Sequence, residues 1–483
     1  MKFKIKKEMI TLIQLYIIFS FCICLVLLLF LSNRNYFNNM HVFILSWIAN
    51  IIMFFSCYCI YYIYKKITHI HIVFLFCYLF NFGQSFFWSV GIHLADEIGT
   101  TKLFSNFHIP TTSEIANSLI YTDFCFLFFS FGIIFILSLF KKEIMNKKIN
   151  LNSELNLNLI YKMSVILGFF VIPLTFIKII ITIRYAFSYG YGALYYGDFS
   201  LPNVFYYIET FFFPVLIGIL IGSKYKKRKI VYWMFGVYVF MYLLAGERGN
   251  WLYKLITLLW MHNYFFKSIN VKKIFKYILI SLPFLYLINY IVQNRNNFES
   301  LLSFSYFIES FDVFNNPIFG FVKEMGMSLG VSLMVIYFGK EAFPIGNTFI
   351  SSIISSVSSS FASFLGVDGI FLGNYLSQTI LKIKYGTGFN IFAECYVNGG
   401  FIGGVVYSLI LGVMVALLLN TNLDIQKNKN YIKLIYTCAV TPVICSMFRD
   451  SSLSIFKQLV QIAIVYVLLI KILSWLFNYR KDF

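Results

Sequence analysis

The chain has 483 residues, of which 59% are hydrophobic and only 12% are charged. A soluble domain contains about half apolar and about a quarter charged residues, so this composition excludes a soluble globular protein and predicts an integral membrane protein. The formal net charge of +19 comes from short basic clusters between apolar runs. These clusters lack the interleaved aromatic residues of a nucleic-acid-binding segment, and such a pattern instead sets membrane orientation.

The apolar runs predict an all-α, polytopic membrane protein with about twelve spanning helices. In chain order we expect them at residues 9–32, 40–64, 69–93, 117–140, 158–183, 204–223, 230–246, 250–266, 277–293, 391–419, 434–448 and 453–477. We expect residues 1–483 to form a single transmembrane domain.

Basic clusters occur at every second connection between these helices, for example at Lys65/Lys66 and in the segment 224–229. Because basic loops stay in the cytoplasm, both termini are predicted to be cytoplasmic. The same rule places the segment Asn294–Asn390 outside, as a large extracytoplasmic loop that carries short helices.

Two stretches of this loop are apolar. Gly326–Phe338 is too short to span, and we expect it to be re-entrant or to lie on the surface. Residues 348–366 predict an amphipathic helix at the membrane interface, because apolar residues recur at helical spacing and serines cover the other face. The serine face indicates either a solvated surface or a sugar-binding surface.

Charged residues within or beside the predicted helices gather near their outer ends. They are Asp123, Lys178, Glu209, Lys254, Glu394 and Lys457, together with Arg184, Arg248, Arg295 and Arg449. Charge inside a membrane is costly, so this one-sided placement predicts a cavity for an anionic headgroup, and arginine is well suited to a diphosphate. Each residue taken alone is better explained as a helix-end anchor, and it is their placement together on one side that points to the cavity.

Four segments resemble motifs of one family. "GTGFNIFAECYVNGGFIGGVVYSLILG" (386–412) has a glycine-rich turn, an early glutamate and spaced glycines. "AGERGNWL" (245–252), "FNNPIFGFVKEMGMSL" (314–329) and "MFRDSSLSI" (447–455) resemble a Gly-x-Arg-Gly turn, a Glu-x-Gly segment and a last arginine-containing turn. In this order they resemble the O-antigen polysaccharide polymerases, the Wzy family.

This resemblance implies a glycosyltransferase of the bacterial cytoplasmic membrane. The family joins oligosaccharide repeat units carried on undecaprenyl diphosphate, which serve as both donor and acceptor, on the outer face of that membrane. The resemblance implies no cofactor and no nucleic acid, and it points to a polysaccharide chain-length regulator as a further partner. The absence of zinc-ligand spacing and of clustered histidines also predicts a metal-independent reaction.

Candidate roles follow for the matched residues. Arg248 and Arg449 become candidate clamps for the diphosphate, and Arg295 joins them by its position at the mouth of the large loop. Glu394 and Glu324 are candidate catalytic bases, although Glu394 also fits a helix N-terminal carboxylate stabilised by the helix dipole. Lys178, Arg184 and Lys254 are further candidate substrate-binding residues. Gly399, Gly400, Gly403 and Gly404 predict a face for close helix packing.

Three other functions compete with the polymerase. An O-antigen ligase shares the membrane helices and the donor, but it resembles the 386–412 motif less and would be expected to carry a histidine in the large loop. A polysaccharide flippase or transporter would carry charge at mid-depth, which this sequence avoids. A scaffold for other assembly enzymes would leave the arginines at the outer ends unexplained.

Overall fold

The computed structural model describes residues 2–32, 37–92, 107–145, 153–190, 193–196, 199–245, 249–267, 317–383, 387–421 and 431–468, with single positions at 276, 283, 286 and 472. These residues form helices and no strands, which confirms the all-α class. Among them, eight stretches of helix are long and apolar enough to cross a membrane. The chain is therefore a polytopic membrane protein, whereas the larger number of about twelve spans stays a prediction.

The chain divides into two compact units. Unit 1 covers Met1–Lys147, Val322–Asn420 and Ile444–Lys457, and unit 2 covers Lys148–Phe321, Thr421–Val443 and Gln458–Phe483. Three helices contribute residues to both units, namely α14 (Pro317–Met325), α20 (Tyr431–Ser446) and α21 (Ser452–Gln461). The expectation of one transmembrane domain stays a prediction.

Unit 1 is built around long helices that pack side by side. They are α1 (Lys2–Ser32), α2 (Asn39–Tyr64), α3 (His69–Ser89), α4 (Thr112–Met145) and α19 (Ile391–Leu419). Helices α4 and α19 make the closest pair because glycines let their backbones touch. A methyl group on Gly412 of α19 would lie only 2.1 Å from the Phe129 carbonyl oxygen of α4.

Polar contacts tie both ends of α19 to α3. The His69 Nε2 atom lies 3.0 Å from the Leu419 carbonyl oxygen, and Asn390 donates from Nδ2 to Asn81 Oδ1 at 2.6 Å. Asn390 also caps α19, since its side chain accepts from the Phe392 backbone N–H at 2.9 Å. The start of α19 is thereby fixed against the C-terminal half of α3.

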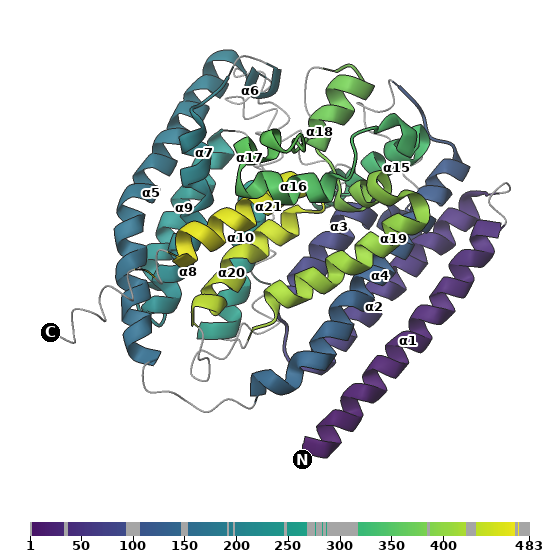
Figure 1. Ribbon diagram of the computed structural model, residues 1–483, viewed down its shortest axis with the longest axis horizontal. Coiled ribbons are helices and arrows are strands. Elements are labelled where there is room, and N and C mark those ends of the chain that lie inside the picture. The colour runs from purple at the N-terminus through teal and green to yellow at the C-terminus, as the bar shows by residue number, and fades with distance from the viewer. Residues whose placement is uncertain are drawn as a thin grey trace. The chain divides into compact units, whose positions relative to one another are not determined.

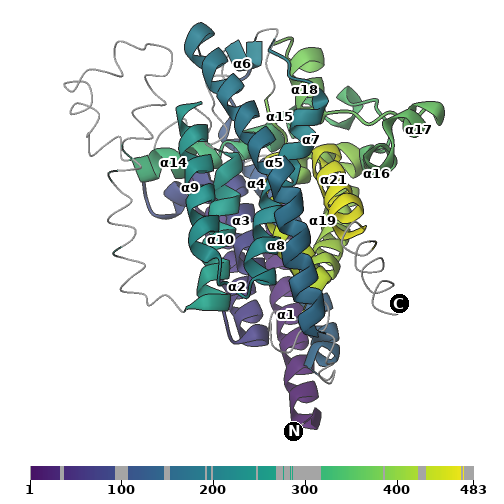
Figure 2. The same ribbon diagram turned by 90° about the vertical axis from the view of Figure 1, so that its left-hand side faces the viewer.

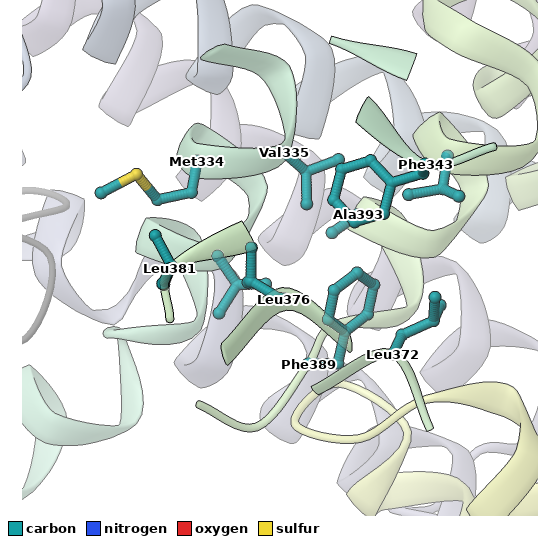
Figure 3. Packing of buried hydrophobic residues seen from close by; sticks show 10 residues of the cluster. Met334, Val335, Phe343, Leu372, Leu376, Leu381, Phe389 and Ala393 are labelled. Carbon is teal, nitrogen blue, oxygen red and sulfur yellow. The ribbon is translucent and has the colours of Figure 1, made fainter. Parts of the chain in front are cut away.

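Short helices cover the end of unit 1 at which α19 begins, the upper end in Figures 1 and 2. They are α15 (Ser328–Phe338), a 3₁₀ turn (Lys340–Ala342), α16 (Thr348–Val357), α17 (Ser359–Phe364), α18 (Leu372–Asn374) and a π-helix (Tyr375–Ile380). A cluster of buried apolar side chains joins α15, α18 and the π-helix to α19: Val335 of α15, Leu372 and Leu376 meet Phe389 and Ala393 at the start of α19 (Figure 3). Short helices are thus confirmed in this segment.

The expectation that Gly326–Phe338 lies on the surface is wrong. Residues 328–335 of α15 are all buried, and α15 packs against α3, α4 and α19. Together with the end of α14, the stretch Gly320–Phe338 is long and apolar enough to cross a membrane, although a turn at Gly326–Met327 divides it. Residues 326–338 alone are too short to span, and the end of α14 supplies the missing length.

Unit 2 contains α5 (Ser153–Tyr189), α6 (Ala193–Tyr196), α7 (Asn203–Thr210), α8 (Phe212–Gly222), α9 (Arg228–Leu244), α10 (Asn250–Met261) and π-helices at His262–Phe266 and Ile462–Val467. Helix α5 packs against α7, α8 and α9. The helix expected at 204–223 is divided at Phe211 into α7 and α8. The span expected at 277–293 lies outside the described residues apart from two single positions.

Large apolar side chains point outward along the long helices. Phe54 of α2 is 71% exposed, and Phe169 of α5 and Ile402 of α19 are each 80% exposed. Contact of such an exposed apolar surface with water is unfavourable, whereas its contact with lipid is favourable. The outward apolar side chains therefore support the membrane assignment in both units.

Candidate functional site

Glu394 lies in the first turn of α19 and is completely buried in unit 1. Three donors reach its carboxylate. Thr348 donates from Oγ1 to Oε1 at 2.6 Å, the Ser452 hydroxyl donates to the same oxygen, and the Ser452 backbone N–H donates to Oε2 at 2.7 Å. The carboxylate therefore joins the starts of α16, α19 and α21.

Asn398, one helical turn after Glu394, completes this network. Its Oδ1 accepts from the Thr348 backbone N–H at 2.7 Å, and its Nδ2 donates to Thr348 Oγ1 at 2.7 Å. The Ser352 hydroxyl of α16 lies 2.8 Å from Ser452 Oγ, and it donates to Ser452 because the one Ser452 hydroxyl hydrogen is given to Glu394. Buried polar groups that satisfy one another in this way hold a single arrangement of the three helix starts.

The serines of α16 face the protein interior. Ser351, Ser352 and Ser355 are buried, while Ile350 and Ile353 on the opposite side are about half exposed. The interpretation of the serine face as solvated is therefore wrong for α16. The amphipathic pattern is real, but α16 ends at Val357, and α17 begins after Ser358, which caps it.

The turn between α20 and α21 carries Arg449 and Asp450 beside this network. Its backbone is pinned to the start of α19, because the Phe389 N–H donates to the Arg449 carbonyl oxygen and the Ile391 N–H donates to the Met447 carbonyl oxygen, both at 3.2 Å. The Arg449 side chain is exposed and Asp450 is partly buried. Burial raises the pKa of the Asp450 carboxyl above its ordinary value, and the neighbouring Arg449 charge opposes part of that rise.

Helix α19 is interrupted just after this network. Gly400 has φ 60° and ψ −153°, a conformation that only glycine adopts readily. Of the glycines expected to form one packing face, Gly404 does pack closely, since an added methyl group would lie 2.3 Å from the Tyr121 hydroxyl. Gly400 and Gly403 face open space, so close packing explains neither of them.

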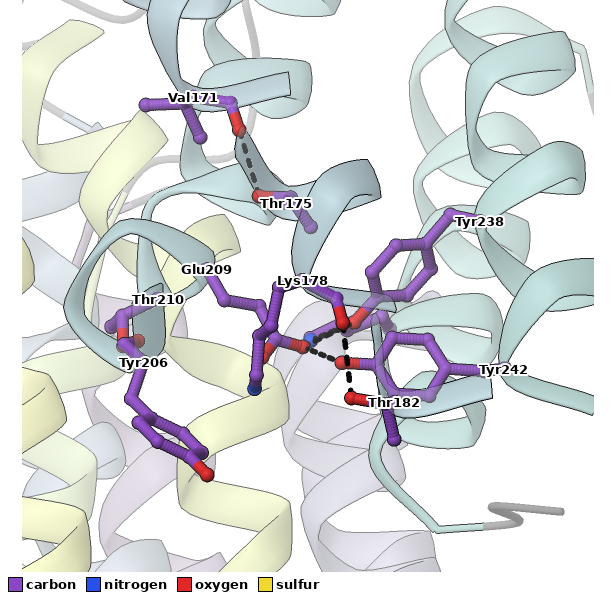
Figure 4. Close-up of polar contacts among 10 residues, drawn as sticks. Val171, Thr175, Lys178, Thr182, Tyr206, Glu209, Thr210, Tyr238 and Tyr242 are labelled. Carbon is purple, nitrogen blue, oxygen red and sulfur yellow. Dashed lines mark hydrogen bonds and ion pairs between the residues drawn. The ribbon is translucent and has the colours of Figure 1, made fainter. Parts of the chain in front are cut away.

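Unit 2 holds a second polar cluster (Figure 4). Lys178 of α5 donates to Glu209 Oε2 of α7, and Tyr242 and Tyr238 of α9 donate to Glu209 Oε1, the latter at 3.2 Å. Lys254 of α10 donates to the Tyr238 hydroxyl at 2.7 Å. The structure thus brings together two of the predicted substrate-binding residues, Lys178 and Lys254, around a carboxylate.

The other predicted site residues are placed separately or not at all. Arg184 is exposed on α5, and Glu324 is half-buried on α14. The donors to Glu394 come from Thr348 and Ser452, so Glu324 takes no part in that network. Arg248 and Arg295 lie outside the described residues.

Several members of these clusters were missed by the sequence analysis. Thr348 and Ser452 are ordinary polar residues at helix starts, and nothing in their spacing links them to Glu394, whereas Asn398 follows Glu394 by one turn of α19. Asp450 could have been found, because it follows Arg449 directly in the quoted "MFRDSSLSI" motif. Tyr238 and Tyr242 lie one helical turn apart, but they are hidden among the 35 tyrosines of the chain.

Among the residues that the structure describes, no group of three or more His, Cys, Asp or Glu side chains is placed to hold a metal ion. Metal independence stays a prediction.

The comparisons with known proteins agree with the motifs. A family model described as O-antigen polysaccharide polymerase Wzy matches residues 12–481. No curated protein and no solved structure matches the chain. Because the matched region covers nearly the whole length and includes the Glu394 network, the Arg449 turn and the Lys178 cluster, the chain belongs to the O-antigen polysaccharide polymerase Wzy family and is a multi-pass membrane protein that polymerises lipid-linked repeat units.

Proposed function

We propose that the chain transfers a growing polysaccharide from undecaprenyl diphosphate onto a new undecaprenyl-diphosphate-linked unit, at the outer face of the bacterial cytoplasmic membrane. The family supports a glycosyl transfer between lipid-linked units. The observation that carries the proposal is the turn between α20 and α21, where exposed Arg449 stands beside partly buried Asp450 on a backbone fixed to the start of α19. A polysaccharide chain-length regulator completes the proposed set of partners.

The reaction places two demands on this turn. A bond forms between an acceptor hydroxyl oxygen and the anomeric carbon of the donor, while the bond from that carbon to the diphosphate oxygen breaks and the electron pair leaves with the diphosphate. Arg449 offers a planar pair of charged donors to the leaving diphosphate. Asp450, with its raised pKa, accepts the proton of the attacking hydroxyl.

Glu394 is the positioning residue of this arrangement. Its two oxygens accept from Thr348 and from two groups of Ser452, and full burial keeps it from a sugar hydroxyl. Because Glu394 holds the start of α21, it also fixes the turn that comes immediately before this helix in the chain. Glu394 thereby acts through Arg449 and Asp450, and the role of catalytic base predicted for Glu394 passes to Asp450, while Glu324 keeps its predicted role on sequence grounds alone.

Arg248 and Arg295 keep their predicted roles as further diphosphate clamps on sequence grounds alone. The outer-face assignment rests on the basic clusters and has its own test. A reporter fused at Lys227 should read as cytoplasmic and one fused at Ile345 as external, and an external signal at Lys227 would overturn the orientation.

The function is tested with purified protein and synthetic undecaprenyl-diphosphate repeat units. A ladder of products longer than one repeat, formed without other proteins, is the expected result. A single transfer onto lipid A core with no ladder would identify a ligase, and passage of the lipid across liposomes without bond formation would identify a flippase. The ladder should also persist in excess EDTA, because the proposed reaction uses no metal.

A further inference from the structure

The Lys178 cluster of unit 2 brings cationic and hydroxyl donors from three helices together at one carboxylate. Two ammonium groups and two phenol hydroxyls, from Lys178, Lys254, Tyr238 and Tyr242, gather around the single carboxylate of Glu209. Lys254 reaches that carboxylate through the Tyr238 hydroxyl, and both lysines act on its charge. Paired cations with additional hydroxyl donors are the set that binds a phosphate, which presents more acceptor oxygens than a carboxylate.

The donors of this cluster are held rigidly. Lys178, Tyr238 and Tyr242 are buried on the long helices α5 and α9, and Tyr238 stacks on Phe212 with ring centroids 4.3 Å apart. The Lys178 ammonium group also lies 4.2 Å from the centre of the Tyr206 ring. A set of donors fixed by packing keeps its geometry when one partner leaves, which is a requirement for an anion site.

The acceptor, in contrast, sits on the shortest helix of the cluster. Helix α7 has eight residues, none of them is buried, and it ends at a break before α8. Both groups that cover Lys178, the Glu209 carboxylate and the Tyr206 ring, belong to α7. An outward movement of this one short helix would break its packing against α5 and uncover the lysine, while Lys178, Tyr238 and Lys254 remain on α5, α9 and α10.

The outer surface of α7 indicates where a ligand comes from. Val204, Tyr206 and Tyr207 are each about half exposed, in a stretch that is apolar enough to cross a membrane. A ligand that displaces α7 therefore arrives from the lipid phase. Its headgroup must be anionic to replace a carboxylate between two lysines.

We propose that Lys178, Lys254, Tyr238 and Tyr242 form a binding site for the phosphate headgroup of a polyprenyl lipid, and that Glu209 occupies this site until the headgroup displaces it. The inference rests on the proposed function, in which two lipid diphosphates, those of donor and acceptor, must be held at once. This cluster supplies one holding site in addition to the Arg449 turn.

The test measures binding of farnesyl diphosphate to the purified full-length protein in nanodiscs of zwitterionic lipid. Glu209→Gln keeps the shape and removes the competing charge, so it should tighten binding about tenfold or more, the effect of one charge-assisted hydrogen bond. Lys178→Met should weaken binding by a similar factor. Lys162→Gln, an exposed lysine of the same helix, is the matched control and should bind as the wild type does.

A double variant guards against misfolding. Lys178→Met combined with Glu209→Gln removes both charges of the pair and should restore the thermal stability lost in Lys178→Met, while binding stays weak. Unchanged or weaker binding in Glu209→Gln would overturn the proposal. So would a double variant that is stable and binds like the wild type.

Two further arms identify the ligand source. Inorganic diphosphate should compete weakly, because it lacks the chain that enters from the lipid phase. Added phosphatidylglycerol should leave the binding of farnesyl diphosphate nearly unchanged. If phosphatidylglycerol abolished that binding, the site would belong to bulk phospholipid, and the substrate assignment would be overturned. The ladder assay is scored separately. If the protein forms ladders but the variants show none of these binding changes, this inference alone is wrong. If the variants show these binding changes but the protein forms no ladders, the proposed function is wrong.

Discussion

Two enclosed carboxylates, that of the buried Glu394 in unit 1 and that of Glu209 in unit 2, whose side chain is 12% exposed, are satisfied in different ways. Both lie in stretches apolar enough to span a membrane, where an unsatisfied carboxylate is costly. Glu394 is satisfied by hydroxyl and backbone N–H donors that belong to other helix starts, whereas Glu209 is satisfied by a lysine and two tyrosine hydroxyls with a second lysine behind them.

The difference concerns what each carboxylate holds. The donors of Glu394 are neutral and belong to the helix starts that it joins, so losing the carboxylate loosens the structure itself. The donors of Glu209 are fixed by their own helices, so the carboxylate is the part that can be exchanged. Neutral partners therefore indicate a structural joint, and cationic partners indicate a place for another anion.

Removal of the Glu394 side chain should have the largest effect. Glu394→Ala leaves the Thr348 hydroxyl and two donors of Ser452 without their acceptor, which should cost about 3 kcal/mol or more of unfolding free energy, since each orphaned buried donor costs about 1–3 kcal/mol. We expect no polymer and a lower melting temperature in nanodiscs. Ser359→Ala, at an exposed position of α17, serves as the control. A stable Glu394→Ala protein with wild-type ladders would remove the distinction between the two glutamates.

Arg449→Ala should lower turnover without lowering stability. The side chain is exposed, and the turn is held by the Arg449 carbonyl group, which the substitution keeps. Loss of one donor to a leaving diphosphate typically costs about a hundredfold to a thousandfold in rate. Initial rates of chain extension, measured beside the melting temperature, check this. The rate of Arg449→Lys should lie between the rates of the wild type and of Arg449→Ala. Equal rates in all three proteins would end the clamp hypothesis.

Asp450 should control the pH dependence of the reaction. A proton acceptor must be ionised, so activity should rise as the pH increases through the raised pKa of Asp450. Asp450→Asn should extend chains slowly, and its rate should no longer rise with pH through the acidic range. The measurement is the initial rate against pH, with protein stability followed over the same range. A full acidic limb in Asp450→Asn would place the titrating group elsewhere.

The interruption of α19 allows a smaller and sharper comparison. Gly400→Ala forces a side chain into a conformation that costs roughly 1–3 kcal/mol, although there is space for the methyl group. Gly403→Ala also meets open space, but in helical backbone, where alanine is favoured by roughly 0.5–1 kcal/mol. Melting temperatures should move in opposite directions, and ladders should shorten only in Gly400→Ala. Equal behaviour would mean that the break after Asn398 has no part in holding the Glu394 network.

The sequence predicts the helices well because a spanning helix needs a long apolar run, and such runs are visible without tertiary information. It also predicts Arg449 and Glu394 as residues of interest. It does not predict their neighbours: Lys178 and Glu209 lie on different helices, and their pairing depends on how α5 and α7 pack. The serines of α16 face inward and its isoleucines outward, because the rule that polar faces meet water does not hold beside lipid.

The outward apolar row of α16 and α17 has a consequence for the membrane itself. Val357 at the end of α16 is 67% exposed and Phe364 of α17 is 84% exposed, whereas Ser352 of α16 is buried against Ser452. Such a row settles at the level where hydrocarbon meets the headgroups. Bilayer thickness sets that level, and a mismatch is relieved by tilting or shifting the elements in contact with lipid. Polymer length should therefore change with the acyl-chain length of the host lipid, so that the bilayer acts as a mechanical part of the enzyme.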